Sequence, residues 1–539
     1  MREDDVSKAK YLVADTSALR AECPDMPKRI KVFDTTLRDG EQTPGVNLTS
    51  DEKYRTAMLL DSLGVDVIEA GFPASSAGEV ELFKRLSDAP MSAKICALAR
   101  ASTPDIDAAL SAGANYVHVF IATSDIHMKY KLKMSREEVL DRAVKSVEYV
   151  KAHGLPAEFS CEDATRSDPE FIKQVYMAVE DAGADMLNVP DTVGASTPRT
   201  VYRMIREIRG YVKRPISMHM HNDFGLAVAN TLAGVEAGAQ QIQVTVNGVG
   251  ERAGNASLEE VVMALRLLYG IETNIQTEKL FEASQFVAKL FKVWPSPNKA
   301  IVGENAFAHT AGIHVHGIQA NALTYEPFLP ELVGQKRRIL FGKLIGTSAV
   351  KAWLGERGIK ATEEEIKAVT GKIKEIGDRG RGVRDLELMA IIDSVTGRSS
   401  KQRIALKQLL VTTGTEAKPT ARITLSVDSK EIPAEKSGDG PVDAALNAIE
   451  SVPTPLGRLK LKEYHLDPLT GGSDALCEVY TTLQSESGEE ETGYAVGPDI
   501  VITSIQAMIN GMNCLLDRRA SRGSIASHAA EAERNQEKR

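Results

Sequence analysis

Hydrophobic and polar positions alternate in a regular way over the first 250 residues of the chain. Short runs rich in β-branched and apolar residues are separated by longer stretches whose apolar residues recur at helical spacing. The longer stretches, several of them closed by glycine, predict helices such as Ser50–Leu63, Ser135–Ala152 and Asp168–Ala182. The short runs predict eight strands: Ile30–Thr35, Asp66–Phe72, Lys94–Ala99, Tyr116–Thr123, Ala157–Asp163, Met186–Asp191, Pro215–His221 and Gln241–Val249.

Eight strand–helix units at intervals of roughly 20–40 residues match a (β/α)8 barrel in count and length. A doubly wound open sheet is the alternative, but its ligand would sit at one switch point, whereas polar residues here follow nearly every strand. We therefore predict an α/β protein with a TIM barrel over residues 29–298, preceded by an N-terminal extension of residues 1–28.

The remainder of the chain has a different texture. Residues 299–400 are predicted to form connector subdomains, with a charged helical stretch from Thr362 to Thr396 that Gly380 and Gly382 interrupt. Residues 401–520 contain an internal repeat, in which A-R-I-T-L-S-V-D-S-K…S-G-D-G-P-V-D-A-A-L-N-A-I is echoed by C-E-V-Y-T-T-L-Q-S-E-S-G…A-V-G-P-D-I-V-I-T-S-I-Q-A-M. Each half predicts paired strands, a glycine-rich turn and a helix, hence a pseudo-symmetric α+β domain. The polar residues 521–539 are expected to be a disordered tail.

Composition limits the classes of function. A chain of 539 residues, 43% hydrophobic and 26% charged, is typical of a soluble globular protein with two or three domains. The net charge of −9 gives no electrostatic reason to expect a nucleic-acid partner. No apolar run approaches the roughly 20 residues that cross a bilayer, and the acidic start is not a secretory signal. Five scattered cysteines without a C-x-x-C pair fit a reducing compartment, so we expect a cytoplasmic protein.

The segment S-M-H-M-H-N-D-F-G, Ser217 to Gly225, carries the clearest candidate chemistry. Successive strand residues point to opposite faces, so His219 and His221 share one face at the end of a strand. Two such imidazoles form half of a site for a divalent metal. The alternative is a pair of hydrogen-bonded structural histidines.

Barrel closure extends this half-site. Strand 8 would pair with strand 1, which runs into F-D-T-T-L-R-D-G-E-Q with Arg38 and Asp39, and strand 8 runs into N-G-V-G-E-R-A-G-N, ending at Asn255. Asp39, the two histidines and Asn255 would then meet at the C-terminal mouth, where such barrels carry out their chemistry. Asp39 as a turn cap and Asn255 as a helix start are the structural alternatives.

Such a set of two nitrogen and two oxygen ligands suits Zn, Mn or Mg, and ligand softness does not decide among them. The metal would polarise a ketone. Arg38 would stabilise an oxyanion beside it or, alternatively, form a salt bridge across the mouth. The intervening strands add polar side chains, of which Glu162 is either a core ion pair or a functional group. The others are His118, Ser160, Asn188 and Thr192.

Three segments resemble signatures of one enzyme family, the 2-isopropylmalate, homocitrate and citramalate synthases. They are F-D-T-T-L-R-D-G-E-Q-T-P-G, S-M-H-M-H-N-D-F-G-L-A-V-A-N and V-T-V-N-G-V-G-E-R-A-G-N, and the resemblance runs from about Arg29 to Arg518. These enzymes condense acetyl-CoA with a 2-oxo acid in a Claisen-type reaction. The resemblance implies a homodimer, a divalent metal on Asp39, His219, His221 and Asn255, and Arg38 at the keto and enolate oxygens. It also implies a substrate pocket formed by His118, Ser160, Glu162, Asn188 and Thr192.

The choice of 2-oxo acid depends on further segments. I-E-A-G-F-P-A-S-S, F-I-A-T-S-D-I-H-M-K-Y-K-L-K and N-V-P-D-T-V-G resemble the 2-isopropylmalate synthase form. That form implies 2-oxoisovalerate as substrate and a role in leucine biosynthesis. The alternative is (R)-citramalate synthesis from pyruvate on an isoleucine route, because one or two methylenes change discrimination by only about 1–3 kcal/mol.

The connector contains N-K-A-I-V-G-E-N-A-F-A-H-T-A-G-I-H-V-H-G, then T-Y-E-P. In the family this subdomain crosses to the partner's active site, and His314 and Tyr325 match its catalytic His and Tyr. Either His314 or Glu162 could take the acetyl proton, and the sequence leaves that choice open. The chain departs from the family pattern at Thr310, Ala311 and His316, and at Leu344 and Ile345 within G-K-L-I-G. These departures make a catalytically weak ligand-sensing paralogue an alternative. A lyase that runs a related cleavage on the same barrel is a separate alternative, which the C-terminal effector domain disfavours.

The C-terminal repeat resembles the allosteric domain of 2-isopropylmalate synthases, which implies leucine as feedback inhibitor. Citramalate synthases carry the same domain and sense isoleucine, and without the resemblance the region would be interpreted as a dimerisation module. Helix N-termini beside glycine-rich turns can receive an amino-acid carboxylate. The candidate effector-binding residues are Gly438, Gly440, Asp443, Gly497 and Asp499.

Overall fold

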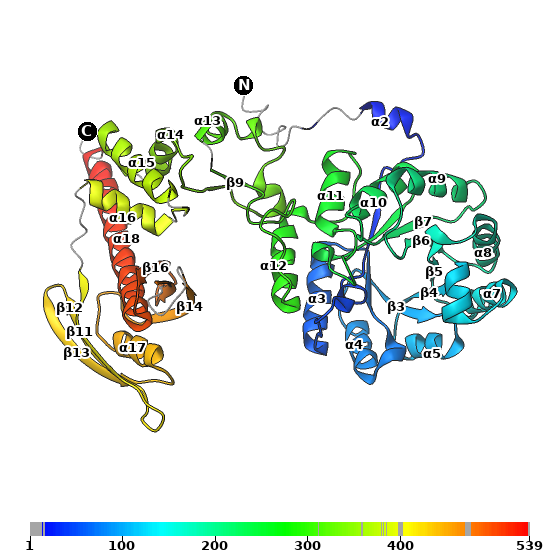
Figure 1. The fold of residues 1–539 in the computed structure, drawn as a ribbon, viewed down its shortest axis with the longest axis horizontal. Helices are drawn as coiled ribbons and strands as arrows, with labels where there is room; N and C mark the ends of the chain where they lie inside the picture. The colour runs from blue at the N-terminus through cyan, green and yellow to red at the C-terminus, as the bar shows by residue number, and fades with distance from the viewer. Residues whose placement is uncertain are drawn as a thin grey trace. The chain divides into compact units, whose positions relative to one another are not determined.

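The computed structural model consists of two compact units (Figure 1). It describes residue 13 and residues 17–310, 312–356, 359–378, 380, 382–383, 385–396, 403–468 and 476–536. The first unit comprises Met1–His309 and Gly317–Arg338, and the second comprises Thr310–His316 and Ile339–Arg539. The first unit therefore continues past residue 298, where we predicted the barrel domain to end.

Eight parallel strands in the first unit close into a barrel in sequence order, which confirms the predicted fold. Closure is made by β8 against β1, with Lys31 opposite Gln241. The last strand ends five residues earlier than predicted, because the chain turns at Asn247, whose φ of 62° lies in the left-handed region. The strands are β1 (Lys31–Asp34), β2 (Val67–Gly71), β3 (Lys94–Arg100), β4 (Tyr116–Ala122), β5 (Ala157–Glu162), β6 (Met186–Asp191), β7 (Ile216–Met220) and β8 (Gln241–Val244).

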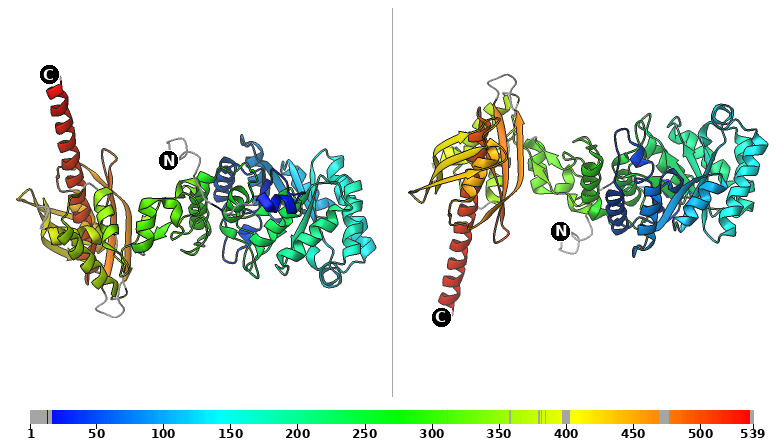
Figure 2. Two further views of the ribbon diagram at one scale, coloured as in Figure 1. Left: turned by 90° about the horizontal axis from the view of Figure 1, so that it is seen from above. Right: turned by 90° about the horizontal axis from the view of Figure 1, so that it is seen from below.

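Helices surround the barrel on its outer side (Figure 2). Local sequence sets their ends: Thr49 and Ser135 begin two of them with capping boxes, and Gly64 ends one with a φ of 94°. Their apolar faces and the strands form one large core. The main helices are α3 (Ser50–Leu63), α4 (Ala77–Ser87), α5 (Thr103–Ser111), α7 (Arg136–Ala152), α8 (Pro169–Asp181), α9 (Pro198–Arg209), α10 (Ala227–Glu236), α11 (Leu258–Leu267) and α12 (Leu280–Phe291).

The second unit begins with helices and ends with a duplicated α+β motif, as the repeat predicted. The helices α14 (Thr347–Glu356), α15 (Glu363–Asp378) and α16 (Asp385–Thr396) share a core around Trp353 and Ile366. Two three-stranded antiparallel sheets follow, each succeeded by a helix. The first half is β11 (Ile404–Thr412), β12 (Thr420–Val427), β13 (Lys430–Ser437) and α17 (Pro441–Glu450). The second half is β14 (Leu459–Pro468), β15 (Cys477–Ser485), β16 (Glu490–Gly497) and α18 (Ile500–Gln536).

Helix α18 differs from the expected end of the chain. Its last part, from Ser521, is helical where we expected a disordered tail. Alanine, glutamate and arginine favour helix there, and extending an existing helix requires no new nucleus. Contrary to our expectation that no apolar run approaches the length needed to cross a bilayer, one window, Ile500–Asp517, has that length and composition, but 61% of it is buried. Its apolar residues, such as Ile505 and Ile509, belong to the core under the sheets.

Candidate metal and substrate site

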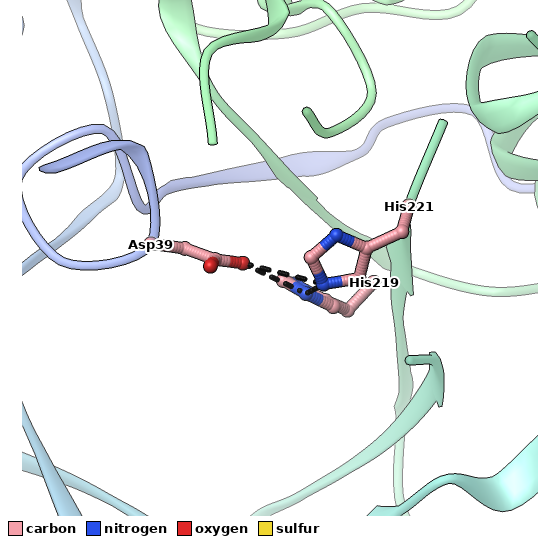
Figure 3. Close-up of side chains that lie close together, drawn as sticks. All are labelled: Asp39, His219 and His221. Atoms are coloured by element: carbon pink, nitrogen blue, oxygen red, sulfur yellow. Dashed lines mark hydrogen bonds and ion pairs between the residues drawn. The ribbon is translucent and has the colours of Figure 1, made fainter. Parts of the chain in front are cut away.

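Three potential ligand atoms meet at the mouth of the barrel (Figure 3). The Nε2 atoms of His219 and His221 lie 3.2 Å apart, and Asp39 Oδ2 lies 3.2 Å from the first and 3.6 Å from the second. Three ligands bound to one cation at about 2.1 Å, with angles of about 90–110°, would be about 3.0–3.5 Å apart. The observed triangle therefore fits one divalent cation.

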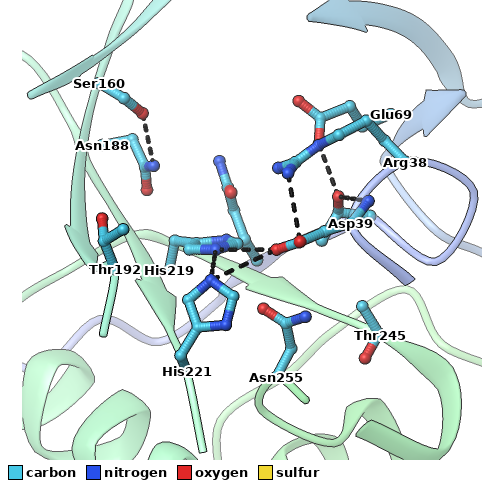
Figure 4. Close-up of polar contacts among 12 residues, drawn as sticks. Arg38, Asp39, Glu69, Ser160, Asn188, Thr192, His219, His221, Thr245 and Asn255 are labelled. Atoms are coloured by element: carbon cyan, nitrogen blue, oxygen red, sulfur yellow. Dashed lines mark hydrogen bonds and ion pairs between the residues drawn. The ribbon is translucent and has the colours of Figure 1, made fainter. Parts of the chain in front are cut away.

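The loop after β8 orients Asn255 towards this triangle. The Asn255 side-chain amide nitrogen donates to the Val249 carbonyl at 3.1 Å, and Thr245 Oγ1 donates to the same oxygen at 2.7 Å. Because the NH2 group is committed to the loop, Asn255 Oδ1 is left buried and without a hydrogen-bond partner among the described residues. Figure 4 shows this side chain beside His221 and Asp39. Asn255 thus offers an amide oxygen as a fourth ligand.

The charge states of these groups also suit a cation. Burial alone would raise the pKa of Asp39, but the Arg38 guanidinium and the two imidazoles hold that pKa well below its usual range. Burial and the neighbouring His219 lower the pKa of His221 to about 4. At neutral pH the site therefore presents a carboxylate and a neutral His221, whose lone pair is free to bind a metal.

Arg38 is held beside the triangle by two carboxylates. Its Nε donates to Glu69 Oε2 at 2.6 Å, and its Nη1 lies 3.4 Å from Asp39 Oδ1. The salt bridge that we considered as an alternative role of Arg38 is therefore present, with Glu69 as its main partner. Since a guanidinium has five N–H donors, Arg38 retains donors for a ligand in the cavity that it lines.

Glu69 begins a hydrogen-bonded chain with residues from four strands. His118 Nδ1 lies 2.7 Å from Glu69 Oε1, and His118 Nε2 lies 2.6 Å from Ser160 Oγ. Asn188 Nδ2 donates to Ser160 Oγ at 2.7 Å, so the Ser160 hydroxyl proton is free to point at His118 Nε2. His118 then carries its proton on Nδ1 and donates it to Glu69. The chain fixes the tautomer and orients three of the predicted pocket residues.

A cavity of about 340 Å³ opens beside the triangle, a size common for small-molecule sites. The residues that line it include the triangle, the polar Arg38, His118, Ser160 and Asn188, and the apolar Leu98, Phe120 and Pro190. Thr192 and Glu162 also line it. Thr192 Oγ1 accepts from the Asp163 amide at 2.9 Å, so its hydroxyl proton remains available to a ligand. The barrel thus gathers all the predicted pocket residues at one cavity.

The two predicted catalytic residues of the connector are not among the residues that line this cavity. His314 is exposed on α13 (Gly312–Ala320), in the part of that helix that belongs to the second unit. Tyr325 belongs to the first unit, is 46% exposed and does not line the described cavity. Their catalytic roles stay predictions. Of the departures from the family pattern, Leu344 is exposed and Ile345 is buried, while Ala311 lies outside the described residues.

The predicted effector residues lie at the starts of α17 and α18. Asp443 Oδ2 accepts from the Asp439 amide at 2.8 Å, and Asp499 Oδ1 accepts from the Ile502 amide at 2.9 Å. A side chain on Gly438 would strike Asp443, and one on Gly497 would strike Thr503. These contacts show that the turns are tightly built around capping carboxylates, and effector binding there stays a prediction.

Glu69 is the residue of the site that the sequence interpretation missed. It is fully buried in the apolar strand V-I-E-A-G. The signal that drew attention to Glu162, an acidic residue among apolar strand residues, applies equally to Glu69 and would have found it.

Known proteins resemble this chain over most of its length. Residues 29–287 match the HMGL-like family model, residues 301–381 the homocitrate synthase post-HMGL domain-like model, and residues 382–516 the LeuA allosteric (dimerisation) domain. The 2-isopropylmalate synthase of Methanocaldococcus jannaschii is 52% identical over 92% of this chain and 96% of its own. The (R)-citramalate synthase of the same organism is 47% identical over 90% of this chain and 100% of its own. The solved hydroxymethylglutaryl-CoA lyase of Pseudomonas aeruginosa covers 52% of this chain and 97% of its own, at 24% identity and a TM-score of 0.47.

Proposed function

The chain belongs to the family of 2-isopropylmalate, homocitrate and citramalate synthases, and from this premise we propose that it condenses acetyl-CoA with 2-oxoisovalerate to form 2-isopropylmalate and CoA. The observation that carries the proposal is the convergence of Asp39, His219 and His221 beside a cavity lined by Arg38 and Glu162. The reaction needs a polarised ketone, a base for the acetyl methyl group and water to release CoA. The residues around the cavity supply the first two.

A divalent cation held by Asp39, His219, His221 and Asn255 would supply Lewis-acid polarisation of the ketone. Mn, Mg and Zn all suit this ligand set. Arg38 directs its remaining donors at the oxygen on which negative charge develops. As the neutral ketone becomes an alkoxide, the fixed guanidinium of Arg38 therefore stabilises the negative charge on its oxygen.

The other polar residues orient the 2-oxo acid and the product. The Thr192 hydroxyl group donates a hydrogen bond to the substrate carboxylate. Asn188 Oδ1 is buried and has no partner within the described part of the chain, so it accepts from the hydroxyl that forms as the ketone becomes an alcohol. Glu162 is the base in the cavity wall, and His314 is the alternative base.

The size of the substrate depends on the apolar wall of the cavity. Leu98, Phe120 and Pro190 form a surface for the isopropyl group of 2-oxoisovalerate. Pyruvate presents only a methyl group there and would lose about 1–3 kcal/mol of contact. Citramalate synthesis from pyruvate is the second candidate, favoured by the 47% identity to a citramalate synthase.

The second unit is proposed to join two copies of the chain and to bind leucine as a feedback inhibitor. Its match to an allosteric dimerisation domain supports both parts. Isoleucine is the alternative effector, and a catalytically weak sensor is the alternative for the whole chain. We propose that the homodimeric enzyme acts in the cytoplasm, because its five cysteines are all free, as expected in a reducing compartment.

The test is CoA release with a panel of 2-oxo acids, followed with a thiol reagent in the presence of Mn²⁺. We expect kcat/KM for 2-oxoisovalerate to exceed that for pyruvate by about tenfold or more, and leucine to inhibit. The variant Asp39→Ala is the control for release that does not depend on the site. Preference for pyruvate would assign citramalate synthesis. No CoA release with any 2-oxo acid, with leucine still bound, would contradict an enzymatic role.

A further inference from the structure

Glu162, at the end of β5, lies in the wall between two cavities of the first unit. One is the cavity of the metal triangle, and the other, of about 410 Å³, is lined by residues such as Arg100 and Arg142. Phe120, Lys131 and Glu162 line both. The contacts of Glu162 therefore determine which of the two cavities its carboxylate faces.

Two cationic or protonatable side chains face the Glu162 carboxylate, and one of them, Lys131, is hydrogen-bonded to it. Lys131 Nζ lies 2.6 Å from Oε1 and 2.9 Å from Oε2, so the ammonium contacts both oxygens. His127 Nδ1 lies 3.8 Å from Oε1, and His127 Nε2 lies 4.0 Å from Asp163 Oδ2. His127 Nδ1 is buried and makes no hydrogen bond within the described residues, so it faces Glu162 without a competing partner.

Lys131 and His127 come from one short segment between β4 and α7. It comprises α6 (Asp125–His127) and the π-helical turn η3 (Met128–Leu132), and π-turns occur frequently at functional sites. Met128 is buried and anchors the turn in the barrel core. Lys129 in the same turn lies 5.0 Å from the Tyr130 ring and outside both cavities. The turn thus directs one of its two lysines at Glu162 and the other at the surface.

The positive charge of Lys131 offsets negative charges that gather around Glu162. Asp163 places a second carboxylate next to Glu162, although Arg166 pairs with it through two hydrogen bonds. An anionic 2-oxo acid in the same cavity would add further negative charge. Without a facing cation, these charges would favour protonated Glu162, and a protonated carboxyl group cannot act as a base.

We propose that Lys131 and His127 are positioning residues that keep the Glu162 carboxylate ionised and aimed into the cavity of the metal triangle. The inference rests on the proposed function in one respect, that Glu162 receives the acetyl proton. In that step the C–H electron pair becomes the enolate, and the proton moves to a Glu162 oxygen. Lys131 stabilises the carboxylate before the transfer and touches neither reacting carbon.

The first test measures the ionisation of Glu162 directly and requires no turnover. Protein labelled with ¹³C at the glutamate δ-carbon is titrated by NMR, and the Glu162 resonance is the one lost in Glu162→Gln. We expect the titration midpoint in Lys131→Met to lie about one pH unit above that of the wild type. Lys131→Arg should restore the midpoint in part, and Lys129→Met is the matched control. An unchanged midpoint in Lys131→Met would overturn the inference whatever the reaction of the protein is.

The second test uses CoA release. We expect Lys131→Met to move the acidic limb of kcat/KM upward by about the same amount as the NMR midpoint, and to lower kcat about tenfold because the carboxylate is no longer aimed at the acetyl group. His127→Gln should cause smaller changes of the same kind. In the Glu162→Gln background, Lys131→Met should lower kcat little further, because both changes act on the same carboxylate. Additive losses would show that Lys131 acts independently of Glu162 and would contradict the proposal. A wild type that releases no CoA would instead contradict the proposed function and leave the NMR result to decide this inference.

Discussion

Replacing Glu69 with glutamine tests how the buried charge network supports the site. Glu69 is fully buried and contacts Arg38 Nε at 2.6 Å, His118 Nδ1 at 2.7 Å and Thr35 Oγ1 at 2.6 Å. Burial alone would raise its pKa, but Arg38 and His118 lower it to about 2 from an ordinary value of 4.5. That difference corresponds to about 3 kcal/mol in favour of the ionised form.

The variant Glu69→Gln keeps the shape of the side chain and removes its charge. Arg38 and His118 then lose their shared anionic partner in a buried position, for which a loss of roughly 2–4 kcal/mol in the free energy of unfolding is expected. Because the folded pKa of Glu69 is depressed, its stabilisation is fully present above about pH 4.5. It is lost as the pH falls towards 2, so the gap between variant and wild type should narrow on acidification.

Differential scanning calorimetry measures both effects on the full-length protein. At pH 7 the transition of the barrel should fall by several degrees in Glu69→Gln, and the gap should shrink towards the lowest pH at which the wild type stays folded. Glu81→Gln is the matched control, since Glu81 is exposed on α4 and should change stability by less than about 0.5 kcal/mol. Equal stability of the two variants at pH 7, or a gap that widens on acidification, would refute this account of the network.

Three further predictions concern the mouth of the barrel. Gly254 has a φ of 86°, and a Cβ there would lie 1.9 Å from the Gly248 carbonyl oxygen, so Gly254→Ala should distort the loop that carries Asn255. The affinity for Mn²⁺, measured by calorimetry, should fall about tenfold, and an unchanged affinity would contradict this prediction. Arg252 donates to both oxygens of Asp223 and to the Thr192 carbonyl, so Arg252→Met should raise KM for the 2-oxo acid about tenfold with a smaller change in kcat. Dialysis against EDTA should abolish CoA release and added Mn²⁺ should restore it, whereas activity that survives chelation would exclude a role for the metal.

Most of the barrel and the positions around its mouth followed from pattern alone. Strand and helix periods are local properties, and closure in sequence order then determines which strands are neighbours, so Asp39 and His219 could be placed together. The partner of Arg38 could not be predicted in this way. Glu69 lies on the neighbouring strand, and its contact depends on the register between β1 and β2 and on the rotamers of two long side chains.

Other differences have similar causes. The turn at Asn247 that ends β8 early depends on a left-handed residue that composition did not reveal. The helical continuation of α18 past Ser521 depends on a helix nucleated by the core of the second unit. Contact between Lys131 and Glu162 requires a π-turn, which has no strong sequence signature.

Binding of Mn²⁺ to metal-free protein, measured by equilibrium dialysis in wild type and in His219→Ala, tests the central claim most directly. His153→Ala is the matched control, because His153 is exposed at the end of α7 and away from the barrel mouth. The account predicts one tightly bound ion per chain in the wild type and in His153→Ala, and affinity lowered at least about 100-fold in His219→Ala. One ion bound with wild-type affinity in His219→Ala would contradict it.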